Sequence, residues 1–400
     1  MRKYTAAFGY QREAIDKGWR PNTESGAAFL SDDLGCIAGA IALPLSDIAA
    51  TAGNSRKNMT PTERRKSAET PTDVAKARRF SVAPMMDWTD RHCRYLHRLL
   101  TRNALLFTEM VTSAAIVHGD VERHLAFDPF EQPVALQLGG SDPAELAKAV
   151  RLAQPYAYAE INLNVGCPSD RVQSGRFGAC LMAEPNLVAD CVRAMRDATD
   201  RPVTVKCRIG IDDQDTEESL DRFADAMVAA GVDALYVHAR KAWLKGLSPK
   251  ENRTIPPLDY PRVHRLRASL TPLPVMINGG IDTLELAEAE MAHMDGVMLG
   301  RAAYHNPLLL AEVDSRFFGD TRPVPTLETV MGEMADYAER HLAEGGKLNN
   351  ITRHMLGLAN GVPGARQFRQ ILSVDAARRG AGVEVLDRAM AAITPLSAAS

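Results

Sequence analysis

From Arg79 onwards, short apolar runs alternate with segments in which apolar residues recur every three to four positions. Runs of this length predict buried strands, and the longer period predicts amphipathic helices. Eight strands are expected, at 80–84, 105–111, 134–139, 159–166, 203–210, 234–240, 275–280 and 296–300. Because eight strand–helix units across about 240 residues exceed what a doubly wound sheet usually holds, we predict an α/β fold of the TIM (β/α)8 barrel type.

The chain changes character on either side of this pattern. After about Arg322 the strands stop, and helical periodicity over 326–343, 350–358, 364–373 and 383–393 predicts a small all-helical domain at 323–400. The barrel is assigned to 79–322. Residues 1–78 are rich in alanine, serine and threonine and weakly periodic, so we expect a disordered extension. It is either a functional tail or an upstream over-reading of the gene, with Met59 as the true start.

The composition, 46% hydrophobic and 24% charged residues, is that of a soluble globular protein. Six cysteines occur without a C-x-x-C pair, which argues against zinc sites, iron–sulfur sites and a disulfide framework, so no metal is expected. The sequence has no apolar stretch of about 18 residues and no signal peptide. We therefore expect a cytoplasmic monomer without a membrane partner.

Polar side chains share one face of the expected strands. In the segment 203–209, apolar residues alternate with Lys206 and Arg208, so both cations are expected to point into the barrel. The same parity directs inwards Gln137, Asn162, Asn164, His238, Arg240 and Asn278. Any one of these is ordinarily a hydrogen-bonded core residue, but together they are costly to bury without a ligand. The pattern predicts a ligand site at the barrel mouth.

The last two expected strands end in glycines. Asn278-Gly279-Gly280 follows the seventh strand and Gly300-Arg301 the eighth, where TIM barrels commonly bind phosphate through backbone N–H groups. Glycines after strands are also ordinary turn residues. FMN fits this set, since Gln137 and Asn278 would pair with its ring and Lys206 would stabilise the reduced flavin. Its ring would pack on Pro84, Met85 and Met86. No G-x-G-x-x-G follows a strand, which argues against a Rossmann site.

A thiol ends the fourth expected strand. Gly166 permits close backbone approach and Pro168 prevents continuation of the strand, so Cys167 is expected on a rigid corner. A thiol held in this way is a candidate catalytic group, although cysteine is also among the residues most often buried for packing alone.

Six motifs, in order along the chain, resemble those of the flavin-dependent tRNA-dihydrouridine synthases. They are Ala83–Asp90, Leu136–Gly140, Asn162–Ser169, Val205–Gly210, Val237–Arg240 and Ile277–Gly280. Three further segments are most similar to the bacterial A-type branch of that family: Lys241–Arg253, Ile351–Leu358 and Gly361–Arg369. The resemblance runs from about Arg79 to about Ser373 and does not include residues 1–78.

The resemblance implies an FMN-dependent oxidoreductase that reduces the C5–C6 double bond of uridines 20 and 20a in the tRNA D-loop. NADPH or NADH would reduce FMN in ping-pong turnover, hydride would pass to C6, and Cys167 would protonate C5. Thiols titrate near pH 8.5 and are therefore mostly protonated at neutral pH, which suits a general acid. Asn164 would hold the base or the flavin. The implied cofactor-binding residues are Pro84, Met85, Met86, Gln137, Lys206, His238, Asn278, Gly279, Gly280, Gly300 and Arg301.

RNA contacts are expected mainly in the helical domain. The formal net charge of −3 gives no global basic signal, but the segment 345–379 carries six cations against one acid. Such a cluster is also typical of a solvated helix face. The resemblance favours tRNA phosphate contacts by Arg366 and Arg369, and by Lys250 and Arg253 after the sixth strand. The target base would have to leave its stack to reach the barrel mouth.

Two other functions stay open at this point. One is an FMN-dependent barrel oxidoreductase that acts on a free pyrimidine, which would not need the C-terminal cation cluster. The other is a flavin-free RNA-binding barrel, and the set Gln137, Lys206, His238 and Cys167 argues against it.

We expect residues 1–58 to be dispensable, because a segment without apolar periodicity cannot offset the entropy lost on ordering it. A chain that begins at Met59 should keep the thermal unfolding midpoint and the activity of the full chain. A lower midpoint or lost activity would show that the segment docks on the protein or on the RNA.

Overall fold

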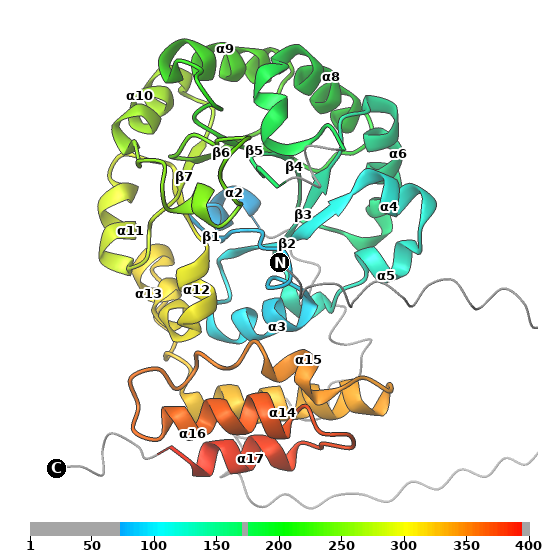
Figure 1. Ribbon diagram of the computed structural model, residues 1–400, viewed down its shortest axis with the longest axis vertical. Helices are drawn as coiled ribbons and strands as arrows, with labels where there is room; N and C mark the ends of the chain where they lie inside the picture. Colours follow the sequence, from blue (N-terminus) through cyan, green and yellow to red (C-terminus); the bar gives the residue numbers. More distant parts are fainter. Residues whose placement is uncertain (1–72, 170–174, 394–400) are drawn as a thin grey trace, which may run out of the picture. The chain divides into compact units, whose positions relative to one another are not determined.

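The computed structural model describes residues 73–169 and 175–393. Eight parallel strands close into a barrel in sequence order, each paired with the next and β8 with β1 (Figure 1). The strands are β1 (Phe80–Val82), β2 (Leu105–Thr112), β3 (Val134–Gly139), β4 (Glu160–Val165), β5 (Val203–Arg208), β6 (Leu235–His238), β7 (Val275–Asn278) and β8 (Gly296–Leu299). The predicted TIM barrel is confirmed.

A ring of helices covers the outside of the barrel (Figure 1). They are α3 (Arg91–Leu100), α4 (Ser113–His118), α5 (Val121–Leu125), α6 (Pro143–Ala153), α8 (Pro185–Arg196), α9 (Thr216–Ala229), α10 (Tyr260–Leu270), α11 (Leu284–Met291), α12 (Arg301–His305) and α13 (Val313–Phe318). Short 3-10 helices join them, at η1 (Pro129–Glu131), η2 (Gln154–Tyr156), η3 (Gly178–Ala183), η4 (Glu251–Arg253) and η5 (Pro307–Glu312). No helix in residues 73–169 or 175–393 is long and apolar enough to cross a membrane.

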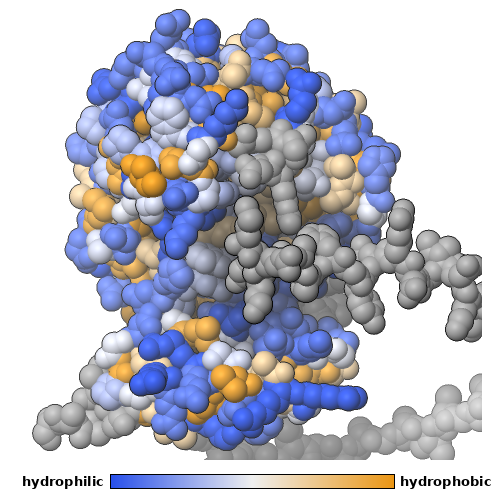
Figure 2. All heavy atoms as spheres, in the orientation of Figure 1, coloured by the Kyte–Doolittle hydropathy of each residue, from blue (hydrophilic) through white to orange (hydrophobic). Residues whose placement is uncertain are grey.

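Strand parity divides the barrel into two apolar clusters. Val203, Val205 and Cys207 of β5 belong to the large cluster between the strands and the helices. Alternate residues of other strands, among them Phe107 and Tyr236, fill a smaller cluster inside the barrel. The face of the protein shown in Figure 2 is mostly hydrophilic, with scattered hydrophobic residues over the barrel and the helical domain.

The amino-terminal end of the barrel is closed by residues just before β1. Helix α2 (Val74–Ala77) is capped by Asp73, and Ala77 joins the inner cluster. Arg78 is 5% exposed, and its Nε atom donates to Glu160 Oε2 at 2.7 Å. Residues 73–78, expected as part of a disordered extension, therefore belong to the barrel, because a buried ion pair anchors them. The rest of that expected extension, 1–72, lies outside the described residues.

The helical domain consists of α14 (Leu327–Ala343), α15 (Leu348–Thr352), α16 (Ala365–Gln370), the π-helix η6 (Ile371–Asp375) and α17 (Glu384–Ala391) (Figure 1). The helix expected at 350–358 is shorter than predicted and continues as turns. Backbone at Gly357 lies so close to the barrel that a Cβ there would be 2.3 Å from the carbonyl oxygen of His305. Asn360 Nδ2 donates to the same oxygen at 2.7 Å. These contacts with the barrel take the place of a longer helix.

The helical domain joins the barrel through the start of α3. Asp90 caps α3 and forms ion pairs with Arg353 (2.5 Å) and His354 (3.0 Å) of the helical domain. Although burial opposes its charge, the hydrogen bond from His354 holds the pKa of Asp90 well below its usual range. Tyr95 of α3 stacks on Tyr337 of α14 with ring centroids 4.0 Å apart. The Asp90 carboxylate and this aromatic pair therefore connect α3 to the helical domain, beside the contacts of Gly357 and Asn360 with His305.

Candidate active site

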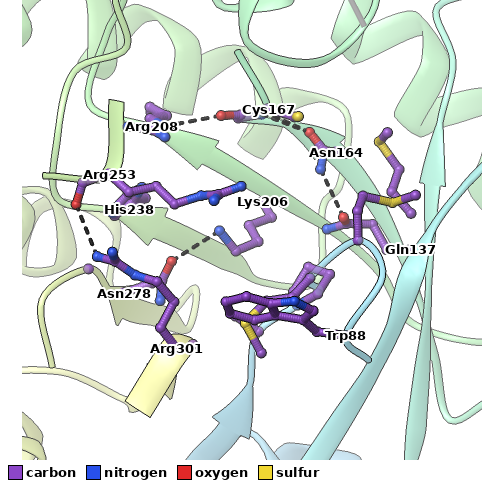
Figure 3. A pocket seen from close by; sticks show the side chains of 18 of the residues that line it. Trp88, Gln137, Asn164, Cys167, Lys206, Arg208, His238, Arg253, Asn278 and Arg301 are labelled. Carbon is purple, nitrogen blue, oxygen red and sulfur yellow. Dashed lines mark hydrogen bonds between the residues drawn. The ribbon is translucent and has the colours of Figure 1, made fainter. Parts of the chain in front are cut away.

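A cavity of about 690 Å³ opens at the carboxyl ends of the strands (Figure 3). It is lined by residues from the loops after β1, β4, β6, β7 and β8, together with residues of the strands β2 to β7. Fourteen sequence-predicted site residues line it: Pro84, Met85, Met86, Gln137, Asn164, Cys167, Lys206, His238, Arg253, Asn278, Gly279, Gly280, Gly300 and Arg301. Lys250, Arg366 and Arg369 do not line this cavity. Its volume is in the range of small-molecule and cofactor sites.

The cationic part of the cavity is built on β5 and β7. Lys206 Nζ donates to Asn278 Oδ1 at 3.1 Å, and Asn278 Nδ2 donates to the carbonyl oxygen of Met298 at 2.7 Å. Burial, with nearby Arg208, lowers the pKa of Lys206 to about 8. The amine is therefore mostly charged at neutral pH and easily discharged above pH 8.

His238 of β6 lies beside these cations as a neutral ring. Burial, with Arg208 and Lys206 nearby, lowers its pKa well below the usual value. A Cβ at residue 279 would be 2.3 Å from His238 Cδ2, and Gly279 also has a φ of +114°. Only glycine fits both the backbone and the imidazole at this position.

Two amides form the adjoining wall. Asn164 Nδ2 donates to Gln137 Oε1 at 2.8 Å, and Gln137 Nε2 donates to Asn162 Oδ1 at 2.8 Å. Both Asn164 and Gln137 line the cavity, whereas Asn162 is fully buried beneath them. The two lining amides keep a fixed orientation and retain some hydrogen-bonding capacity towards a ligand.

Cys167 lies on the corner that its flanking residues predicted. The backbone N–H groups of Gly166 and Cys167 both donate to Asn164 Oδ1, at 3.1 and 3.0 Å. The carbonyl oxygen of Cys167 accepts from the N–H of Ala179 at 2.9 Å. The thiol is partly buried in the cavity wall, and Sγ lies 3.6 Å from Ser169 Oγ. These three backbone hydrogen bonds fix the position of Cys167, so its thiol can contact the same atom of each bound ligand.

Three arginines make one side of the cavity positive. Arg208 donates from Nε to the carbonyl oxygen of Gly166 (3.1 Å), and from Nη1 to those of Lys241 (3.1 Å) and Asn252 (2.8 Å). Burial, with Arg253 nearby, lowers the pKa of Arg208 to about 10. Arg301 donates to the carbonyl oxygen of Arg253 at 3.3 Å. The guanidinium of Arg253, a predicted tRNA contact in the loop after β6, reaches into the cavity (Figure 3).

An apolar wall faces the cations. It is formed by the segment 84–86 and by Trp88, which is not among the predicted site residues. The Trp88 indole stacks on Tyr304 at a centroid distance of 4.4 Å and meets His305 edge to face at 5.0 Å. Other lining residues that were not predicted include Asp87, Met110, Asp282 and His305. Trp88 lies in the motif that follows the first expected strand, and this position could have identified it as a site residue.

The predicted cations of the helical domain lie on α16. Arg366 lines a second hollow of about 440 Å³ together with Gln367, Gln370 and Asp375. Arg369 Nη1 donates to Asn360 Oδ1 at 3.3 Å, and both arginine side chains are exposed. In the described residues, no group of three or more His, Cys, Asp or Glu side chains could hold a metal ion.

Comparison with known proteins points to one family. The family model for dihydrouridine synthases matches residues 81–394. A tRNA-dihydrouridine(20/20a) synthase from Vibrio parahaemolyticus is 58% identical over 316 residues, which cover 79% of this chain and 97% of that protein. Enzymes of the same name from Shewanella oneidensis and Escherichia coli K12 are each 58% identical, over 77% and 80% of this chain and 92% of each relative.

Proposed function

The chain belongs to the dihydrouridine synthase family, and on that premise we propose that it reduces uridine to dihydrouridine in the tRNA D-loop, at positions 20 and 20a. The observation that carries the proposal is the position of Cys167 in the wall of the cavity that Lys206, Gln137 and Asn278 also line. A proton donor, a cation and paired amides in one cavity are what reduction of a uracil ring beside a flavin requires.

The residues of the cavity fit FMN. Lys206, Gln137, His238 and Asn278 would bind the polar edge of its ring, and the segment 84–86 would pack on its face. Backbone N–H groups after β7 and β8, with the Arg301 guanidinium, would bind its phosphate. When bound and reduced by NADPH or NADH, FMN supplies the hydride for C6 of uracil.

The chain itself supplies the proton. Cys167 would donate the thiol proton to C5 of uracil as the C5–C6 double bond is reduced, and solvent would reprotonate the thiolate afterwards. Asn164 holds the backbone of Cys167 through two N–H groups. It would thereby keep the thiol on one side of the uracil ring. Trp88 and the segment 84–86 would exclude water from the opposite wall.

The helical domain favours tRNA over a free pyrimidine as the substrate. Arg366 and Arg369 are exposed on one face of α16, three residues apart, and Arg353 lies at the joint with the barrel. Lys250 is an exposed cation in the loop after β6. A free pyrimidine needs none of these cations, whereas the phosphodiester backbone of an RNA would pair with cations of this kind.

The function is tested directly with the purified full chain. We expect a yellow flavoprotein that releases FMN, oxidises NADPH and forms dihydrouridine in unmodified tRNA, as measured by mass spectrometry of tRNA digests. Free uracil should not be reduced at a comparable rate. A colourless protein, or one that reduces free uracil as readily as tRNA, would contradict the proposal.

Lys206 should make FMN binding dependent on pH. Its lowered pKa of about 8 means that the charge is lost as the pH rises through 8. We expect the affinity of the apoprotein for FMN, measured by fluorescence quenching, to fall by up to about tenfold from pH 7 to pH 9. Lys206→Met should bind FMN more weakly and show little change over this range. An unchanged affinity of the wild-type protein from pH 7 to pH 9 would exclude this role.

Removal of the thiol should separate the two half-reactions. Cys167→Ala should retain FMN and NADPH oxidation but form dihydrouridine about a hundred- to ten-thousand-fold more slowly in single turnover, because only proton transfer uses the thiol. Cys180→Ala is the matched control, since Cys180 is also a free, partly exposed thiol that does not line the cavity. Equal rates for Cys167→Ala and the wild-type enzyme would leave Cys167 with a structural role only.

Charge reversal on α16 should weaken tRNA binding. The double variant Arg366→Glu, Arg369→Glu should reduce the slope of log affinity against log salt, by about 0.7 to 0.9 for each lost phosphate contact. FMN content and NADPH oxidation should stay the same. The matched control is Lys148→Glu, Arg151→Glu, also exposed and three residues apart but on α6 of the barrel. If both double variants keep the wild-type slope, α16 does not contact tRNA phosphates.

A further inference from the structure

A line of side-chain hydrogen bonds runs through the barrel from the cavity to its amino-terminal end. Asn164 donates to Gln137, and Gln137 to Asn162, both at 2.8 Å. Asn162 Nδ2 donates to Thr204 Oγ1 at 2.9 Å, and Thr204 Oγ1 donates to Glu160 Oε1 at 2.6 Å. All five side chains are at most 8% exposed. We call these five residues the polar chain.

Every bond of the polar chain has the same direction, with the donor nearer the cavity. The carboxylate of Glu160 can only accept, so the Thr204 hydroxyl must donate its proton to it and accept from Asn162. The amide of Asn162 is then oriented, and it orients the amide of Gln137 in turn. At the amino-terminal end of the polar chain, Arg78 forms an ion pair with the same carboxylate, and its Nε lies 2.7 Å from Glu160 Oε2. A buried charge thus sets the direction of three amides.

At the cavity end of the polar chain, Asn164 fixes the backbone of Gly166 and Cys167. Asn164 Oδ1 accepts from the N–H groups of Gly166 and Cys167 at 3.1 and 3.0 Å. If the Asn164 amide were reversed, its NH2 group would face two donors and its oxygen would face the oxygen of Gln137. Each such buried mismatch leaves polar groups unsatisfied. Correct presentation of Cys167 therefore requires one orientation of Asn164.

We propose that Glu160 and Thr204 are positioning residues for the reaction: through the polar chain they fix the orientation of Gln137 and Asn164, and with it the placement of the Cys167 thiol. Neither residue lines the cavity. The consequence for uridine reduction rests on the proposed function, whereas the consequence for the Cys167 loop is a property of the chain alone.

The test uses Thr204→Val, which removes the hydroxyl at similar volume and leaves the Arg78–Glu160 ion pair in place. Thr204→Ser restores the hydroxyl. Tyr236→Phe is the matched control, because the Tyr236 hydroxyl lies 3.4 Å from the same carboxylate but outside the polar chain. Two quantities are measured: the rate of Cys167 alkylation by iodoacetamide in the apoprotein, followed by peptide mass spectrometry, and dihydrouridine formation by the FMN-loaded enzyme.

With Thr204→Val we expect several-fold faster alkylation of Cys167, because its loop is less tightly held, and about tenfold lower kcat with the KM for tRNA unchanged. Thr204→Ser and Tyr236→Phe should stay within about twofold of the wild-type protein in both measurements. If Thr204→Val does not fold, Thr204→Ala also removes the hydroxyl and avoids a methyl group at its place, and the same two quantities are measured.

Wild-type alkylation and wild-type kcat in the valine or alanine variant would overturn the proposal. So would equal losses in Tyr236→Phe, which would indicate general destabilisation of the barrel, or failure of Thr204→Ser to restore both quantities. If the wild-type enzyme forms no dihydrouridine, the proposed function is wrong, and the alkylation rates still decide whether the polar chain controls the loop.

Discussion

The rest of the structure depends on one constraint: along each of the eight strands of the closed barrel, successive side chains point alternately to the inside and to the outside. One set of alternate residues packs against the helices, and the other set is enclosed by the barrel wall. Inside, the amino-terminal half holds the apolar cluster of Phe107 and Tyr236 beside the buried polar residues Thr204 and Glu160. Gln137, Lys206 and His238 face the carboxyl ends. The interior is therefore closed at one end and forms a polar cavity at the other, where a ligand can satisfy the buried donors.

The eight strands and the inward residues were predictable because both are local in the sequence. A strand of alternating apolar and polar residues, such as 203–208, carries its parity in its own residues, and the glycines after β7 and β8 are adjacent to the strands that position them. The motif around Cys167 likewise contains the glycine and proline that shape its corner. The barrel and most of the cavity lining followed from such patterns.

The parts that escaped prediction depend on partners far away in the chain. Arg78 belongs to the barrel because of Glu160, which lies 82 residues later. Trp88 lines the cavity because Tyr304, beyond β8, supports its ring. Neither of these contacts leaves a period or a spacing in the sequence.

The joint at Asp90 has a geometric consequence. Asp90 begins α3, follows Trp88 of the cavity wall by two residues, and binds Arg353 and His354 of the helical domain. The aromatic pair Tyr95 and Tyr337 restrains rotation at the same joint. A joint restrained in this way keeps the span between α16 and the cavity constant. If the helical domain binds tRNA as proposed, this fixed span would select a nucleotide by its distance along the folded RNA rather than by the identity of its neighbours.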